Sequence, residues 1–474
     1  MDRDPAARGS DKSRFIFVGS AVIFDLFLAV LPLKAVWPNL DLLQHAQDDL
    51  AKYGVAVSLE WDADIFANVR GGKEQTAVTD GLIQLGLDFD LKKLTGLGIF
   101  DASQLHAEGY YPYGPGISDY VRDLSGVNNN AAYNSPRLYE LWFQKGFKLG
   151  FLESTLRLGS MGADVEFNVI DSAAFFINSS FGAQLAYGGN VPVPVYPFTA
   201  LGARLDVAAG NDWNVKTTFR SAVLDGNSAA PTLGPFAVNA PSQPSYNPHG
   251  VDFHFNPSEG LIFINEVVFD YLSREPKENN VSGPGRWFIG PGRLVIGGFY
   301  STDRMEDIFQ AELRSLGVSP SGKPVRQSRG DHAIYCILEQ KFYEPQLGSP
   351  AGLYFFGRGM FLPDDQNLAT ISVEAGAVYK GLFRRARDVR DSFGIGFGYN
   401  RISGRVQEAD RVAADAGGEE VPNFRFESVV EATYVCPITE HWKLQPDLQW
   451  VIRPGAAGRY PNAVVLGLRS VVTF

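Results

Sequence analysis

Residues 55–65, with the sequence VAVSLEWDADI, alternate between two kinds of side chain. Leu59 and Trp61 lie in one phase, whereas Glu60 and Asp62 lie in the other. A period of two places one set on each face of a β-strand. This strand therefore has an apolar face and an acidic face, and it must separate an apolar medium from water.

The same period recurs along most of the chain, in short segments separated by turn residues. About sixteen such strands are predicted, which is an even number, as in single-chain bacterial outer-membrane barrels. They are expected near residues 55–67, 81–92, 97–107, 139–149, 152–159, 198–207, 213–223, 261–270, 292–300, 332–342, 352–361, 370–380, 392–400, 425–435, 442–451 and 463–473.

The connections between these strands alternate in length. Those at one end run from about 8 to 38 residues, and most of those at the other end are only about 2 to 11 residues long. The connection 273–291 breaks this alternation. The pattern predicts an all-β protein, a 16-stranded antiparallel transmembrane β-barrel with long extracellular loops and short periplasmic turns.

Composition excludes several classes of protein. Lys plus Arg number 42 against 53 Asp plus Glu, a net charge of -11, which argues against a nucleic-acid partner. Cys336 and Cys436 lie too far apart for a disulfide scaffold or a zinc site. Beyond the N-terminus no apolar run of about 18 residues occurs, so a polytopic helical membrane protein is excluded. A transmembrane barrel is not excluded, because its strands are only half apolar.

The N-terminal segment has features of an export signal. Lys12 and Arg14 precede an apolar stretch over 15–33, which Asp25 interrupts. We predict that residues 1–35 form a secretory signal peptide. An uncleaved anchor helix or a misplaced start is the alternative.

The remaining chain divides into two parts. Residues 36–53 are predicted to form an amphipathic helix, because Leu42, Leu43 and Leu50 recur at helical spacing. Residues 54–474 are predicted to form the outer-membrane barrel.

Aromatic residues at strand ends favour a barrel in lipid over a β-sandwich in water. Trp61, Phe89, Trp442 and Trp450 all lie in the apolar phase, as interfacial girdles require. The chain ends on Phe474, also in the apolar phase, and a final strand that ends in Phe resembles the address bound by the barrel assembly machinery. The expected location is the outer membrane of a Gram-negative cell, in contact with its lipid.

Several segments are similar to one known family, the carbohydrate-selective (OprB-type) porins. They occur in the expected order over about 300 residues, and the resemblance implies a sixteen-stranded barrel that lets monosaccharides and small oligosaccharides diffuse passively. It also favours a monomer over a trimer. Residues 381–388 are more basic than is usual for the family. The matching segments are RLYELWFQ at 137–144, LRLG at 156–159 with FN at 167–168, FFINSSF at 175–181, YCILEQ at 335–340, GLFRRARD at 381–388, and LQPDLQW at 444–450 leading to PG at 454–455.

The polar phase of each strand is expected to line the pore, because lipid-facing positions must be apolar. The first hairpin would supply an acidic wall, and the strands that follow 152 a mixed, more basic wall. Sugar hydroxyls donate and accept hydrogen bonds, so neighbouring arginines and carboxylates can replace their hydration. The alternative is that these are solvated charges or ion pairs that hold the wall. The acidic wall comprises Glu60, Asp62, Asp64, Asp88 and Asp90, and the mixed wall Glu153, Arg157, Arg204, Asp206, Lys216 and Arg220.

Trp142 is unusual because it shares the polar phase of its strand with Glu140 and Gln144. Sugar rings stack their C–H faces on aromatic rings while nearby polar groups bind the hydroxyls. These three residues are therefore a candidate sugar-binding platform. The alternative is that a loop such as 161–197 folds inward and covers the indole.

No motif of an enzyme or cofactor site is present. The chain has no HExxH, no His-x-His pair, no GxSxG elbow and no Gly-rich phosphate loop between a strand and a helix. Asp88 and Asp90 lie on one face of one strand, so they cannot flank a glycosidic bond as a hydrolase pair. We predict no catalysis, no cofactor and no metal ligand set.

The leading hypothesis is an outer-membrane porin for carbohydrates. Two alternatives remain open at this point. One is a general or cation-preferring porin without a sugar site, and the other is a plugged barrel with a structural or adhesive role.

Overall fold

The computed structural model describes residues 40–210, 214–226, 247–255, 260–271, 285–318, 327–346, 348–383, 390–416 and 423–474. The predicted signal peptide, residues 1–35, lies outside these ranges. Helix α3, Leu40–Lys52, falls within the segment predicted to be helical, and Gln47 donates a hydrogen bond of 3.0 Å to the carbonyl of Val57 in the first strand. No helix among the described residues is both long and apolar enough to cross a membrane.

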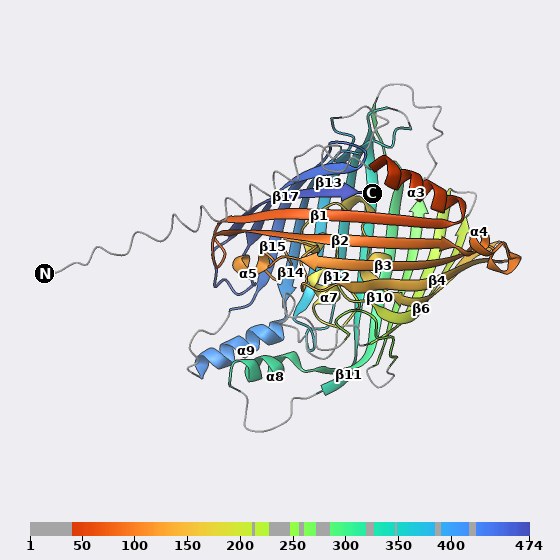
Figure 1. The fold of residues 1–474 in the computed structure, drawn as a ribbon. Helices are drawn as coiled ribbons and strands as arrows, with labels where there is room; N and C mark the ends of the chain where they lie inside the picture. Colours follow the sequence, from red (N-terminus) through yellow and green to blue (C-terminus); the bar gives the residue numbers. More distant parts are fainter. Residues whose placement is uncertain are drawn as a thin grey trace.

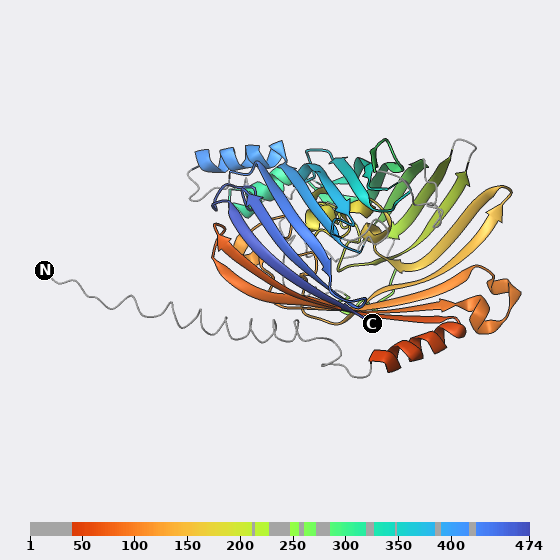
Figure 2. The ribbon, with the colours of Figure 1, turned by 90° about the horizontal axis from the view of Figure 1, so that it is seen from above.

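The strands form one antiparallel sheet that closes on itself (Figures 1 and 2). Each of the sixteen long strands pairs with its neighbours in the sequence, and the first pairs with the last. This closure confirms the predicted sixteen-stranded barrel. A further strand of two residues, β9 Arg286–Trp287, pairs only with the end of β11. The sixteen strands are β1 Val55–Arg70, β2 Thr76–Asp90, β3 Ser103–Tyr113, β4 Arg137–Leu149, β5 Leu152–Met161, β6 Ala200–Gly210, β7 Val215–Asp225, β8 Leu261–Tyr271, β10 Gly292–Glu306, β11 Gln327–Glu344, β12 Gly352–Phe361, β13 Ala369–Lys380, β14 Ser392–Ile402, β15 Phe426–Pro437, β16 Trp442–Ile452 and β17 Ala463–Thr473.

The outer face of the barrel is apolar, in the phase predicted from the sequence. Ile83, Leu85 and Leu448 are exposed, and so is Cys336. One predicted girdle residue differs: Trp442 is only 8 % exposed, and its indole N–H donates to the Ser470 hydroxyl at 3.0 Å.

Most of the long connections lie at one end of the barrel, although 71–75 between β1 and β2 and 362–368 between β12 and β13 are short connections at that same end. The long-loop end, where β1 finishes, carries the connections 114–136 and 162–199 and most of the short helices. The connection between β8 and β10 is the long exception at the short-turn end, as the sequence indicated. The helices of the long loops are α5 Ser118–Val121, α6 Ala163–Glu166, η2 Asp171–Ala173, η3 Ser179–Phe181, α7 Leu185–Gly188, α8 Ile308–Ser315 and α9 Gly404–Asp415.

The strand predicted at 97–107 is placed too early. Strand β3 begins only at Ser103. Helix α4, Leu91–Thr95, lies just before the predicted range, and the 3-10 turn η1, Gly98–Phe100, occupies its start. Asp90 caps this helix by accepting a hydrogen bond from the Lys93 N–H, and Gly96 ends it in the left-handed conformation. The apolar residues within 94–99 resemble the alternating pattern of a strand, but they belong to the end of helix α4 and to the turn η1.

The connection 162–199, called the inward loop below, folds into the barrel. Its apolar side chains, among them Phe176 and Tyr187, form a buried core with lumen-facing residues of β8 and of β10–β13, such as Phe356. Figure 2 shows short helices inside the ring of strands. The sequence left open whether a loop such as 161–197 folds inward, and in this structure the connection 162–199 does so. An apolar core therefore occupies part of the lumen, whereas the sequence phase had suggested that nearly all apolar side chains face lipid.

Two helices, α8 and α9, pack on each other at the long-loop end (Figure 1). Each buries one carboxylic acid in this contact, Glu312 and Asp410 respectively. Burial raises the pKa of Asp410 from 3.8 to about 6, although the Phe424 N–H partly offsets this by donating a hydrogen bond to it. Burial also raises the pKa of Glu312, and the nearby charge of Asp410 adds to the effect.

We expect the α8–α9 pair to be more stable at about pH 5 than at about pH 8. A raised carboxyl pKa means that the folded pair binds more protons than the unfolded chain between about pH 4 and 6, so stability is lost as the pH rises through that window. Hydrogen exchange of the α9 amides, corrected for intrinsic rates, measures this. Asp410→Asn should remove most of the pH dependence, and an unchanged dependence in that variant would contradict the assignment.

Candidate functional site

The mixed wall predicted from the sequence exists on β5, β6, β7 and β8. Arg157 pairs in register with Arg204 on the next strand. One step toward the short-turn end, Asp206 pairs with Arg220, and Arg220 pairs with Glu266 on β8. These residues share the lumen-facing phase, so neighbouring strands stack them into a lattice of two rows, one with two arginines and one in which Asp206, Arg220 and Glu266 alternate in charge.

Ion pairs connect this lattice. The Arg204 Nε lies 3.0 Å from one oxygen of Asp206, and the Arg220 Nε lies 3.4 Å from the same oxygen. The Arg220 guanidinium also lies 3.3 Å from the carboxylate of Glu266. The wall is therefore fixed by cross-strand pairs, as one of the two interpretations of these charges expected.

Glu166, in helix α6 of the inward loop, ties that loop to the wall. Its carboxylate forms ion pairs with both Arg157 and Arg204, and its backbone carbonyl accepts a hydrogen bond from Arg220. The sequence did not indicate this residue, because it lies in a loop without periodicity.

A cavity of about 450 Å³ lies between the inward loop and the charged wall. Of the predicted residues, Glu153, Asp206, Lys216 and Arg220 line it. Arg293 on β10 lines it too, paired with Asp270 at 2.7 Å and with Asp171 of the loop.

Two of these lining residues differ from the rest. Lys216 and Glu153 are exposed, and among the described residues neither has an ion-pair partner. Their charged groups are therefore available to a solute in the cavity, whereas the arginines and aspartates around them already satisfy one another.

Trp142 faces the lumen as predicted, but both faces of its indole are occupied. The His106 ring stacks on it at a centroid distance of 4.7 Å, and the Arg157 guanidinium lies 3.7 Å from its centroid. Its N–H donates to Glu140 at 2.9 Å, and Gln144 accepts from Arg157 at 2.8 Å. His106 and Arg157 of the wall therefore cover the ring, and Trp142 also belongs to the buried cluster that contains residues of the connection 162–199, the loop region named in the alternative.

The pore-facing residues of β3 were missed because its predicted position was wrong. His106 and Glu108 face the lumen there, and the His106 Nδ1 lies 2.8 Å from Asp88. With Glu140 of β4 they place ligand atoms within 4.8 Å of one another, so this is where a metal ion could be held. However, Glu140 already accepts hydrogen bonds from Trp142 and Gly162, so the same geometry describes a hydrogen-bonded wall.

The predicted acidic wall is divided in two. Asp62 and Asp64 face inward but are buried, because side chains of the connection 114–136 cover them: Asn130 donates to Asp62 at 2.8 Å, and Asn128 donates to Asp64 at 3.0 Å. Asp62 therefore anchors a loop and does not line an open pore. Glu60 remains nearer the short-turn end, 3.2 Å from the Gln84 amide.

Comparison with known proteins agrees with this architecture. A family model described as "Carbohydrate-selective porin, OprB family" matches residues 74–474. The chain belongs to the OprB family of carbohydrate-selective porins. It is an outer-membrane channel for sugars, and the proteins it resembles are channels and not enzymes.

Relatives of this OprB-family porin cover nearly the whole chain. Porin B of Pseudomonas aeruginosa is 21 % identical over 443 residues, covering 90 % of this chain and 89 % of that protein. The putative porin QuiX of Acinetobacter baylyi is 21 % identical over 448 residues, with 90 % and 91 % coverage. The high-pH structure of Pseudomonas putida OprB has a TM-score of 0.72 and 21 % identity, covering 91 % of this chain and 97 % of that one, and shows the same fold.

Proposed function

We propose that sugars cross this porin passively along the charged wall of β5–β8, and that they are contacted in the cavity between this wall and the inward loop. The observation that carries the proposal is the cavity of about 450 Å³, in which paired charges surround the unpaired Lys216 and Glu153. A volume in this range suits a small ligand. Monosaccharides and small oligosaccharides are the proposed solutes.

The charge lattice suits an uncharged, hydroxyl-rich solute. Arginines offer donors and carboxylates offer acceptors within the same reach, so each sugar hydroxyl can exchange water for a wall group. Because Arg204, Asp206 and Arg220 are already paired with one another, the wall presents little net charge to attract ions strongly. Sugars would be guided without being held tightly, as passive diffusion requires.

Trp142, Glu140 and Gln144 would act indirectly. The indole and the Gln144 amide hold the Arg157 guanidinium at the lumen wall, and Glu140 holds the indole. We propose that this group positions Arg157 for the solute, and that Glu60 and Asp88 line the wider lumen toward the short-turn end.

The proposal predicts a specific effect of Lys216→Met combined with Glu153→Leu. This variant removes one positive and one negative charge, so the net charge of the lumen is unchanged while both unpaired contacts are lost. Each lost hydrogen bond contributes about 1 kcal/mol, so the glucose concentration that half-blocks ion current should rise about fivefold or more. Planar-bilayer conductance with sugar titration measures this, and the ion selectivity should stay the same.

Lys148→Met provides a matched control. Lys148 is an exposed cation on β4 that does not line the cavity, so its loss should leave sugar block within about twofold of wild type. Liposome swelling in mono- and disaccharides completes the test. Unchanged sugar block in the double variant would refute the site, swelling without any sugar preference would favour a general porin, and absent swelling would favour a plugged barrel.

We further propose the orientation and assembly route that such barrels use. The long-loop end would face outward and the short-turn end the periplasm. The final strand would be the one that the assembly machinery binds, since Phe474 exchanges backbone hydrogen bonds with Leu59 of β1 at the closing seam. A monomer remains the proposed state.

A further inference from the structure

The last residues of β1 contain a β-bulge that changes the direction of one side chain. Asn68 pairs with Val465, yet Arg70 pairs with Val464, so two residues of β1 advance for one of β17. Asn68 is buried inside the barrel, whereas Val464 shares the outward phase of Leu466, which is 48 % exposed. A bulge can redirect a side chain in this way. Without it Arg70 would keep the inward phase of Asn68; with it, the guanidinium lies on the outer surface.

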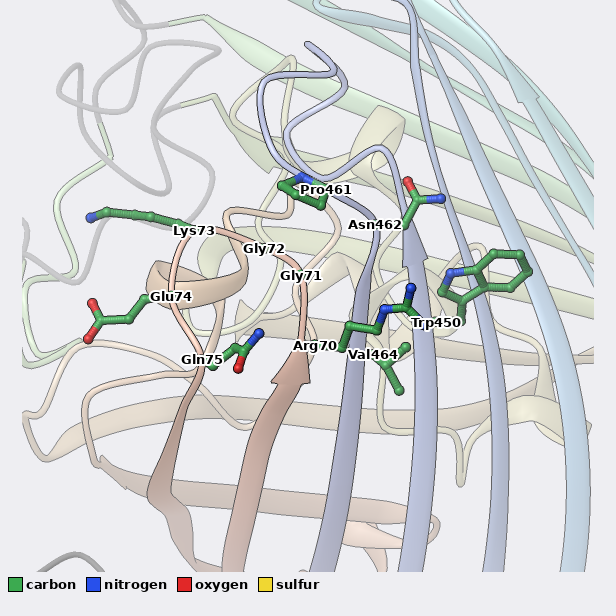
Figure 3. Close-up of a pocket in the computed structure, with 10 residues that line it drawn as sticks. All are labelled: Arg70, Gly71, Gly72, Lys73, Glu74, Gln75, Trp450, Pro461, Asn462 and Val464. Carbon is green, nitrogen blue, oxygen red and sulfur yellow. The ribbon is translucent and has the colours of Figure 1, made fainter. Parts of the chain in front are cut away.

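Arg70 borders a groove on that outer surface. Val464 pairs with Trp450 of β16 as well as with Arg70, so the three residues lie in a row across β1, β17 and β16. The groove has a volume of about 790 Å³ and is completed by Asn462 and the turn 71–75. Figure 3 shows the Arg70 side chain extending toward Val464 and Asn462, with the Trp450 indole beyond them, while Lys73 extends to the other side of the turn.

The groove lies where the apolar band of the barrel ends. Leu448 and Leu466 belong to the band and are nearly half exposed, and Trp450 marks its edge at the long-loop end. Among the described residues, Arg70 has neither an ion-pair partner nor a hydrogen-bonded acceptor. Water can hydrate this exposed guanidinium, but its donors are also free to bind an anion that reaches it from outside the protein.

We propose that this groove binds the phosphate-bearing head group of a lipid in the outer leaflet. The guanidinium fork of Arg70 would take the phosphate, the amide of Asn462 would bind head-group oxygens, and Trp450 with Val464 would contact the part of the lipid next to the acyl chains. A lipid fits better than free phosphate, because the groove joins the Arg70 guanidinium to an apolar strip of Val464 and Trp450, while Lys73 and Glu74 border it at the turn. The inference depends on the outward orientation of the long-loop end proposed above.

Native mass spectrometry of the full chain in detergent, titrated with lipid A, tests the proposal. Arg70→Gln should bind lipid A about fivefold more weakly, the factor for the ~1 kcal/mol that one basic residue contributes beside an anionic lipid surface. Lys73→Gln removes the same charge from a residue that also borders the groove, but whose side chain extends to the other side of the turn, so it should stay within about twofold of wild type. Arg70→Lys should fall between them, because it keeps the charge and loses the fork.

Four further measurements make the result unambiguous. Dephosphorylated lipid A and inorganic phosphate should each bind wild type and Arg70→Gln alike. Equal loss of lipid A in both glutamine variants, or no loss in Arg70→Gln, would overturn the site. Sugar block in Arg70→Gln should match wild type, which separates a failure of this inference from a failure of the proposed sugar site. Labelling of Asn462→Cys in whole cells by an impermeant thiol reagent tests the orientation by itself.

Discussion

Arg358→Met is expected to release the inward loop and to widen the channel. Arg358 is fully buried on the lumen face of β12 and forms an ion pair of 3.1 Å with Glu374. Its remaining donors hold three backbone carbonyls of the inward loop, at distances of 2.6 to 2.9 Å; the carbonyls belong to Asn168, Ser180 and Gly182. Loss of one partner in a buried pair leaves the other charge uncompensated, which costs about 3–5 kcal/mol.

Two measurements separate the effects of this change. The free energy of unfolding in detergent should fall by about that amount, and single-channel conductance should rise because the loop no longer fills the lumen. Adding Glu374→Gln removes the stranded charge, so Arg358→Met/Glu374→Gln should recover much of the stability and keep the higher conductance. If the double variant conducts as wild type does, the loop is held by its apolar core and not by Arg358.

Arg469→Met is expected to weaken the seam at which the barrel closes. Arg469 of β17 pairs with Asp64 of β1 through two contacts, 2.8 and 2.9 Å long. It also donates to the side chains of Asn128 and Asn129, so it anchors the connection 114–136. The Asp64 side chain is fully buried, and its stranded charge should cost about 3–5 kcal/mol.

The heat-induced shift of the folded barrel on SDS gels measures this loss, which should appear as unfolding at a markedly lower temperature. Arg314→Met is the matched control, because Arg314 of α8 forms an exposed ion pair with Glu306 that should contribute less than about 1 kcal/mol. Asp64→Asn combined with Arg469→Met should restore part of the stability. Equal shifts for Arg314→Met and Arg469→Met would show that burial of the seam pair has no special role.

Local periodicity was enough to predict the barrel wall. A strand between lipid and water must alternate, so the phase of each strand and the pairing of neighbours along the chain followed from the sequence alone. The same logic placed Arg157, Arg204 and Arg220 on one side of the lumen, because consecutive strands of an up-and-down barrel are neighbours. It failed at β3, because the apolar residues near 97 belong to the 3-10 turn η1 and not to a strand. His106 was missed as a result.

Contacts between loops and wall could not be predicted in this way. Asp62 faces the lumen as expected, but its burial depends on Asn130, which lies in a connection without any period. Glu166 was missed for the same reason. Phe356 has the inward phase of Arg358, and only the inward loop makes an apolar residue favourable there. Such pairings depend on the path of a loop in three dimensions, which periodicity does not encode.

The charged wall of β5–β8 and the inward loop bound the cavity of about 450 Å³ from two sides. A saccharide on the proposed route would keep one face against that wall and the other against residues 165–171 of the inward loop. Changes of cargo during evolution would then require new side chains on only a few adjacent strands, with the rest of the barrel and its inner core unchanged.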